Sequence, residues 1–89
     1  MPRFFTTRQF EKDFKKAIKS AKSREKISIV LRILAQGDPL PPRYRDHKLK
    51  GVFQDRRECH IEPDLLLIYK VEDDRIVMER LGSHAELFE

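Results

Sequence analysis

The hydrophobic period changes near residue 50, and this change restricts the chain to a fold with its helices in the first half and most of its strands in the second. Apolar residues recur at helical spacing in two stretches before residue 35, with lysines on the opposite side of the first. The two stripes are Phe10, Phe14, Ala17, Ile18 and Ala21, then Ile27, Val30, Leu31 and Leu34. Two amphipathic helices joined so closely should form an antiparallel hairpin.

The helix ends have their own signals. Thr6 or Thr7 can cap the first helix, and Ser23 is expected to begin the second, since hydroxyl oxygens accept free backbone N–H groups at helix starts. Gly37 suits a left-handed residue after the second helix, and the prolines that follow prevent its continuation. Ser83 with Glu86 predicts a short helical turn near the end of the chain.

Strand patterns occupy the remaining segments. We expect strands at residues 3–6, 52–54, 57–62, 65–71 and 76–78. The segment 65–71 is apolar on both faces, which is typical of a central strand. The chain is therefore predicted to be an α+β protein, with the N-terminal strand and helical hairpin packed on an antiparallel sheet of four to five strands. Its 89 residues permit one domain, spanning 1–89.

Charge is divided unevenly along the chain. Residues 1–50 hold 14 Lys and Arg against 5 Asp and Glu, whereas residues 51–89 hold 5 against 10. The basic half favours a polyanionic partner such as RNA, or an acidic protein segment. No apolar run is long enough to span a bilayer and no signal peptide precedes the first helix, so we expect no membrane association. A lone cysteine, Cys59, fits the cytoplasm.

The histidines are the strongest chemical signal. His47, His60 and His84 lie in predicted loops or at strand ends, and none is on a helical stripe. Charged residues accompany them in the sequence: Arg45, Lys48, Lys50, Asp64 and Arg80. Two imidazoles and fixed cations suit RNA cleavage by transesterification, which needs no metal and no cofactor. A metal site including Cys59 is disfavoured, because Cys59 and His60 point to opposite faces of one strand.

Three segments together resemble a known family. Tyr44 to Gly51 is similar to the Y-x-D-H-x-L-x-G element of YafQ-type toxins, a branch of the RelE/ParE superfamily. Residues 57–70 resemble their H-x-E-P-D and L-L-I-Y-K elements, and residues 79–88 their closing R-x-G-[ST]-H-x-x-L-F. The elements occur in family order. Leu65 departs from the pattern, since relatives often carry Trp there, and this departure suggests a different base or codon preference.

The resemblance implies a RelE-like fold and the toxin of a type II toxin–antitoxin system. Such a toxin enters the ribosomal A site, cuts mRNA there and is neutralised by a cognate antitoxin in a hetero-oligomer. By position, His47 matches the general base and His84 the general acid, although the two roles can be exchanged. Arg80 matches the arginine that stabilises the scissile phosphate.

The remaining site residues follow from the same match. His60 and Asp64 correspond to the pair at the strand end, and Phe88 to the terminal aromatic that contacts RNA. We also assign Arg45, Lys48 and Lys50 to RNA contacts, and the basic first half to ribosomal RNA. Two alternatives remain open: a ParE-like inhibitor of DNA gyrase that cuts no RNA, and a non-catalytic RNA-binding module.

Overall fold

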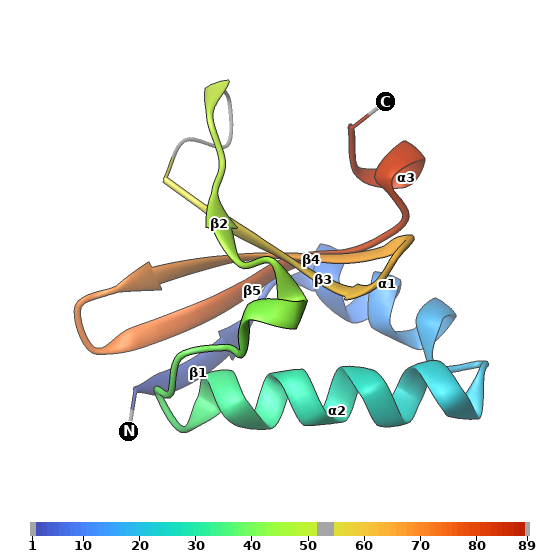
Figure 1. Ribbon diagram of the computed structural model, residues 1–89, viewed down its shortest axis with the longest axis horizontal. Coiled ribbons are helices and arrows are strands. Elements are labelled where there is room, and N and C mark those ends of the chain that lie inside the picture. The colour runs from blue at the N-terminus through green and yellow to red at the C-terminus, as the bar shows by residue number, and fades with distance from the viewer. Residues whose placement is uncertain (1, 52–54, 89) are drawn as a thin grey trace.

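The computed structural model of the chain describes residues 2–51 and 55–88, so the strand expected at 52–54 lies outside the described residues. The elements are β1 (Arg3–Thr6), α1 (Arg8–Ala17), α2 (Ala21–Ala35), the 3-10 turn η1 (Pro42–Tyr44), β2 (His47–Lys48), β3 (Arg57–Glu62), β4 (Leu65–Glu72), β5 (Arg75–Gly82) and α3 (His84–Phe88). In Figure 1, α2 runs along one side of the sheet, whereas β2 and α3 stand on the other side. The predicted α+β order is confirmed.

The sheet has the order β1-β5-β4-β3-β2. The three pairings among β2, β3, β4 and β5 are antiparallel, as expected. β1 instead pairs with β5 in parallel, with Arg3 opposite Arg75 and Thr6 opposite Met78, so the sheet is mixed. Both long helices and three strands lie between β1 and β5 in the sequence, so no tight turn fixes the direction of β1 relative to β5.

The helix ends follow hydroxyl and glycine chemistry, with one shift from expectation. Thr7 caps α1 by accepting from the backbone N–H of Phe10 at 3.0 Å. α2 begins at Ala21 and not at Ser23, because Ser20 is the capping residue and accepts from Ser23 N. Gly37 follows α2 with φ 79°, the left-handed conformation that was predicted. None of the helices in the described ranges is long and apolar enough to cross a membrane.

Two apolar clusters cover the two faces of the sheet. The helix-face cluster is the larger and consists of Phe10, Ile27, Val30, Leu34, Tyr44, Cys59, Ile61, Leu67, Tyr69, Ile76, Met78 and Leu81. The site-face cluster consists of Leu66, Ile68 and Leu87, with Leu49 and Phe88 packed against it. Burial of β4 on both faces confirms its prediction as a central strand. Ile68 lies on the opposite face of β4 from Leu67 and Tyr69, because side chains alternate along a strand.

Candidate active site

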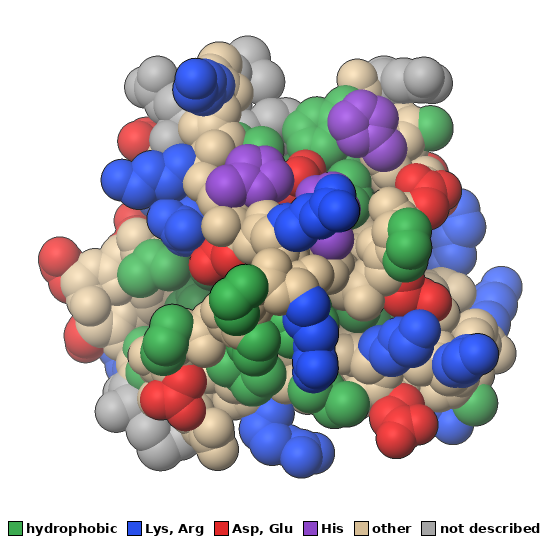
Figure 2. Space-filling view, in the orientation of Figure 1, with side chains coloured by type: hydrophobic (Ala, Val, Ile, Leu, Met, Phe, Trp, Pro, Cys, Tyr) green, Lys and Arg blue, Asp and Glu red, His purple; other side chains and the backbone are tan. Residues whose placement is uncertain are grey.

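Histidine side chains gather on one face of the molecule. Figure 2 shows them at and between the β2 and α3 segments, where the surface is hollowed and Lys and Arg side chains lie close by. We call residues 45–51 the β2 wall and residues 83–88 the α3 wall. Each wall carries one of the histidines assigned to acid–base chemistry: His47 on the first and His84 on the second.

Strand register brings two histidines to one carboxylate. His47 lies opposite Glu58 in the β2–β3 pairing, and His60 lies two positions beyond Glu58 on the same face of β3. Glu58 Oε1 is 3.3 Å from His47 Nε2 and 3.4 Å from His60 Nε2. Glu58 is only 6% exposed. Sequence reasoning missed this residue, although its spacing of two from His60 is a usable signal.

The loop before β2 fixes how His47 presents its ring. Arg45 has φ 50°, in the left-handed region, and its carbonyl oxygen lies 2.7 Å from His47 Nδ1. A carbonyl oxygen only accepts hydrogen bonds, so Nδ1 carries the hydrogen and Nε2 is the basic nitrogen of the neutral ring. That nitrogen faces Glu58. A hydrogen bond between them needs one further proton, shared by His47 Nε2 and the Glu58 carboxylate.

Asp46 anchors the β2 wall to the helix-face cluster. Its Oδ1 accepts from the Tyr69 hydroxyl at 2.7 Å and from Arg57 Nε at 3.1 Å. Tyr69 is 1% exposed, and its burial, together with the Asp46 carboxylate, raises its pKa above the ordinary value. The residue before His47 is therefore anchored to the centre of the sheet.

The α3 wall is held by the ends of its short helix. Ser83 and Glu86 cap it reciprocally, since Glu86 Oε1 accepts from Ser83 N at 2.8 Å and Ser83 Oγ accepts from Glu86 N at 3.2 Å. This predicted capping pair is confirmed. The backbone N–H of His84 donates to Asp64 Oδ1 at 3.3 Å, and the His84 and Phe88 rings lie 4.9 Å apart. The fold thus places Asp64 and Phe88 next to His84.

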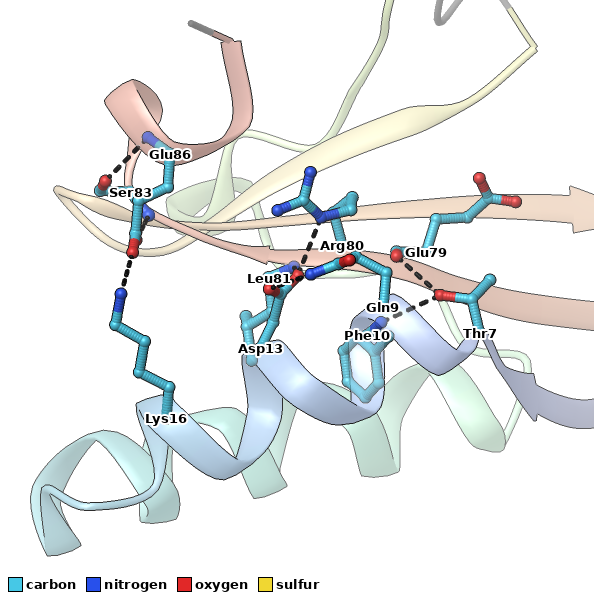
Figure 3. A network of polar contacts seen from close by, with 10 residues as sticks. All are labelled: Thr7, Gln9, Phe10, Asp13, Lys16, Glu79, Arg80, Leu81, Ser83 and Glu86. Carbon is cyan, nitrogen blue, oxygen red and sulfur yellow. Dashed lines mark hydrogen bonds and ion pairs between the residues drawn. The ribbon is translucent and has the colours of Figure 1, made fainter.

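Helix α1 supports the same wall from below (Figure 3). Lys16 Nζ donates to Glu86 Oε2 at 2.6 Å. This bond, with those from Ser83, lowers the pKa of Glu86 to about 2. Arg80 Nε donates to Asp13 Oδ2 at 2.9 Å, and Arg80 and Asp64 line one cavity of about 250 Å³.

The predicted RNA-contact residues lie on both walls. Arg45, Lys48 and Lys50 are exposed on the β2 wall. Arg45 also lines a cavity of about 300 Å³ with His60 and Arg43. Phe88 is half-buried at the end of α3.

One group of side chains among the described residues has the spacing of a metal site. The ligand atoms of His47, Glu58 and His60 all lie within 4.8 Å of one another. Cys59 is absent from this set, as predicted, because its side chain lies in the helix-face cluster. Burial there raises the pKa of its thiol.

The match to known proteins first gives the class. Residues 3–89 match the family described as "Bacterial toxin of type II toxin-antitoxin system, YafQ". A small α+β chain with this match belongs to the toxins of bacterial type II toxin–antitoxin systems. Within that class, this chain is a member of the YafQ family.

Individual relatives agree with the family. The chain is 42% identical to "mRNA interferase toxin YafQ" of Escherichia coli strain K12 over 81 residues, which is 90% of this chain and 88% of the relative. It is similar to YafQ in the crystal structure of the E. coli DinJ–YafQ complex, with a TM-score of 0.91, 38% identity and full coverage of both chains. A metal-bound toxin from Helicobacter pylori is also similar, with a TM-score of 0.87, 42% identity, and coverage of 99% of this chain and 100% of that one.

Proposed function

We propose that this toxin is an endoribonuclease that cuts mRNA in the ribosomal A site by metal-independent acid–base catalysis. The observation that carries the proposal is the pair of opposed walls. His47 stands on one with its basic Nε2 turned inward to Glu58, and His84 stands on the other beside Asp64. The name of the E. coli relative, an mRNA interferase, supports the same substrate.

The reaction is an internal transesterification. His47 Nε2 takes the proton of the ribose 2′-OH, the 2′ oxygen attacks the adjacent phosphorus, and the bond from phosphorus to the 5′ oxygen breaks. His84 gives a proton to the departing 5′ oxygen, so the products are a 2′,3′-cyclic phosphate and a 5′-hydroxyl. Arg80 holds the phosphate and stabilises the charge of the pentavalent transition state.

Neighbouring residues orient the catalytic side chains or bind the RNA beside them. Glu58 orients the rings of His47 and His60, and Asp64 orients the backbone at His84. Phe88 offers an apolar face to a base beside the His84 ring. Arg45, Lys48 and Lys50 bind neighbouring phosphates of the RNA.

Two macromolecular partners follow. The basic first half of the chain is suited to ribosomal RNA, which would make cleavage dependent on the ribosome. A cognate antitoxin is supported by the E. coli structure in which a YafQ toxin is in complex with DinJ. We infer that this toxin also forms a hetero-oligomer with its antitoxin in the cytoplasm.

The test is in vitro translation with mapped mRNA ends. The unaltered toxin, His47→Ala, His84→Ala and an Asp73→Ala control, at the exposed turn between β4 and β5, are compared with and without ribosomes. We expect position-specific cuts that need ribosomes, a loss of about 10²- to 10⁴-fold for either histidine variant, and no loss for the control. Antitoxin binding by each variant shows that it is folded.

Other outcomes would favour the alternatives. Full cleavage by a folded His84→Ala protein would contradict the assignment. Gyrase inhibition without any cut would indicate a ParE-like toxin. Salt-sensitive RNA binding without a cut would indicate a binding module.

A second candidate is transition-metal binding at His47, Glu58 and His60. Their ligand spacing supports it, as does the metal-bound H. pylori relative. Two imidazoles and a carboxylate suit Zn²⁺ or Cu²⁺. An ion there would occupy the nitrogen that must accept the proton, so Zn²⁺ should slow the cleavage, and a chelator selective for Zn²⁺ and Cu²⁺ over Mg²⁺, which leaves the ribosome intact, should restore it. Loss of cleavage with that chelator would overturn the metal-independent mechanism.

A further inference from the structure

Arg80 does not reach the site as a freely moving side chain. Its Nε donates to Asp13 Oδ2 at 2.9 Å, and the same oxygen accepts from the backbone N–H of Leu81 at 3.0 Å. Asp13 is thus bonded both to the guanidinium and to the strand backbone one residue beyond it. Together these contacts form a small closed ring that fixes Arg80 relative to β5.

The carboxylate itself is firmly held. The Asp13 side chain is 13% exposed, and its second oxygen accepts from Gln9 Nε2 at 3.1 Å. Burial alone would raise the pKa of Asp13, but the hydrogen bonds from Arg80, Leu81 and Gln9 lower it overall. Asp13 therefore stays ionised at neutral pH, as a strong acceptor for Arg80 Nε must.

The direction of the contact matters for chemistry. Asp13 engages Nε, at the inner edge of the guanidinium, and Figure 3 shows the outer nitrogens of Arg80 pointing away from α1 toward the side of the sheet where α3 stands. Those outer nitrogens are the ones that can bind two phosphate oxygens in parallel. The cavity of about 250 Å³ at this position is lined by Asp13, Asp64, Arg80 and Ser83 among others, so a phosphate has room beside the guanidinium.

We propose that Asp13 is a positioning residue of the toxin, which fixes Arg80 so that its outer nitrogens are presented to the scissile phosphate. This inference rests on the proposed function of Arg80. An arginine held in advance loses less side-chain entropy when the transition state forms. Asp13 also offsets part of the Arg80 charge, so it does not strengthen the attraction of Arg80 for the phosphate. Its contribution is to the orientation of the guanidinium. Its loss should therefore lower kcat more than it changes KM.

Asp13→Ala is the sharpest variant. The oxygen that accepts from Arg80 Nε also accepts from Leu81 N, so an amide in its place could still hold Arg80, whereas alanine removes the acceptor altogether. Glu11→Ala is the matched control, since it makes the same kind of change on the same helix at an exposed residue bonded to Thr6. Both are compared with Arg80→Ala and with the Asp13→Ala/Arg80→Ala double variant in ribosome-dependent cleavage, and antitoxin binding shows that each variant is folded.

The expected pattern is specific to positioning. Asp13→Ala should lower kcat by about 10- to 100-fold with KM within about threefold, and Glu11→Ala should change neither by more than about twofold. In the Arg80→Ala background, Asp13→Ala should cause no further loss. An unchanged kcat in Asp13→Ala, or a further multiplicative loss in the double variant, would overturn the inference.

A second measurement separates this inference from the proposed function. The Arg80 Nε–H signal is followed by NMR while a DNA analogue of the RNA, which lacks the 2′-OH and cannot be cut, is added. With Asp13 present, the signal should be protected from exchange with water and should shift on binding; in Asp13→Ala it should exchange rapidly. If the unaltered toxin cuts no RNA, the proposed function fails. Identical Arg80 signals in the two proteins would refute the role of Asp13 in either case.

Discussion

The two faces of the sheet differ in how much apolar surface they bury. Among the described residues, twelve buried side chains form the helix-face cluster, whereas three form the site-face cluster. The strand β4 serves both, since Leu67 and Tyr69 point to the helices while Leu66 and Ile68 point to the site. Most of the hydrophobic stabilisation therefore lies on the face without histidines.

The site-face cluster connects the two walls to the sheet. Leu49 packs against it from the β2 wall, and Leu87 and Phe88 belong to the α3 wall. A few apolar contacts thus attach both walls to the same face of the sheet. Hydrogen bonds of Asp46, Asp64 and Glu86 fix the positions of the walls further. Changes on the helix face should affect folding first, whereas changes on the site face should affect cleavage out of proportion to stability.

The largest effect is expected on the helix face. Phe10 is 2% exposed, so Phe10→Ala should lower the free energy of unfolding by about 3–5 kcal/mol, through lost burial and the cavity left behind. Urea denaturation followed by circular dichroism measures it. Phe4→Ala is the matched control, because Phe4 is 38% exposed and its loss should cost under about 1 kcal/mol. Equal losses in the two variants would contradict the assigned face of α1.

A smaller loss of stability with a larger loss of activity is expected for Leu87→Ala. Leu87 is 6% exposed and anchors α3 on Leu66 and Ile68, so its truncation should cost about 2–3 kcal/mol. Because α3 also carries His84 and Phe88, cleavage measured well below the melting temperature should fall by about tenfold or more. Retention of full cleavage by the destabilised protein would show that the α3 wall does not need this anchor.

The helix face could be predicted largely from the sequence. Helical spacing identifies the stripes of α1 and α2, except that Ala21, grouped with the first stripe, is the exposed first residue of α2. Thr7 and Gly37 mark helix ends that the structure confirms. Such signals are local, since each depends on residues within one or two turns. The second helix begins two residues before the expected serine, because Ser20 and Ser23 are both able to cap and only the folded hairpin selects between them.

The site face depended on contacts that local patterns do not contain. The family motifs predicted the histidines, Asp64, Arg80 and Phe88 as site residues, but Glu58 lies between two of those histidines only through the β2–β3 register. The bond between Asp13 and Arg80 joins residues 67 positions apart. The parallel pairing of β1 with β5 likewise links the two ends of the chain. Periodicity reports which face a residue occupies, and not which distant partner it meets.

The smallest predicted effect concerns the hydrogen bonds that hold the α3 wall, and it is tested by changing the pH. Hydrogen bonds from Lys16 and Ser83 lower the pKa of Glu86 from 4.5 to about 2 in the folded protein, so folding favours the ionised form. The stabilisation is therefore complete above about pH 4.5 and is lost as the pH falls toward about 2. Because the Glu86 side chain is 43% exposed, the effect should stay below about 1 kcal/mol.

Glu86→Gln isolates this contribution. The difference in unfolding free energy between the unaltered protein and Glu86→Gln should be largest near about pH 6 and should vanish near about pH 2. Glu25→Gln, on the exposed side of α2, is the control for a general change in charge. A gap for Glu86→Gln that stays constant over this pH range would mean that Lys16 and Ser83 do not anchor α3 through the carboxylate. The α3 wall would then depend on the site-face cluster and on the bond from the His84 backbone N–H to Asp64.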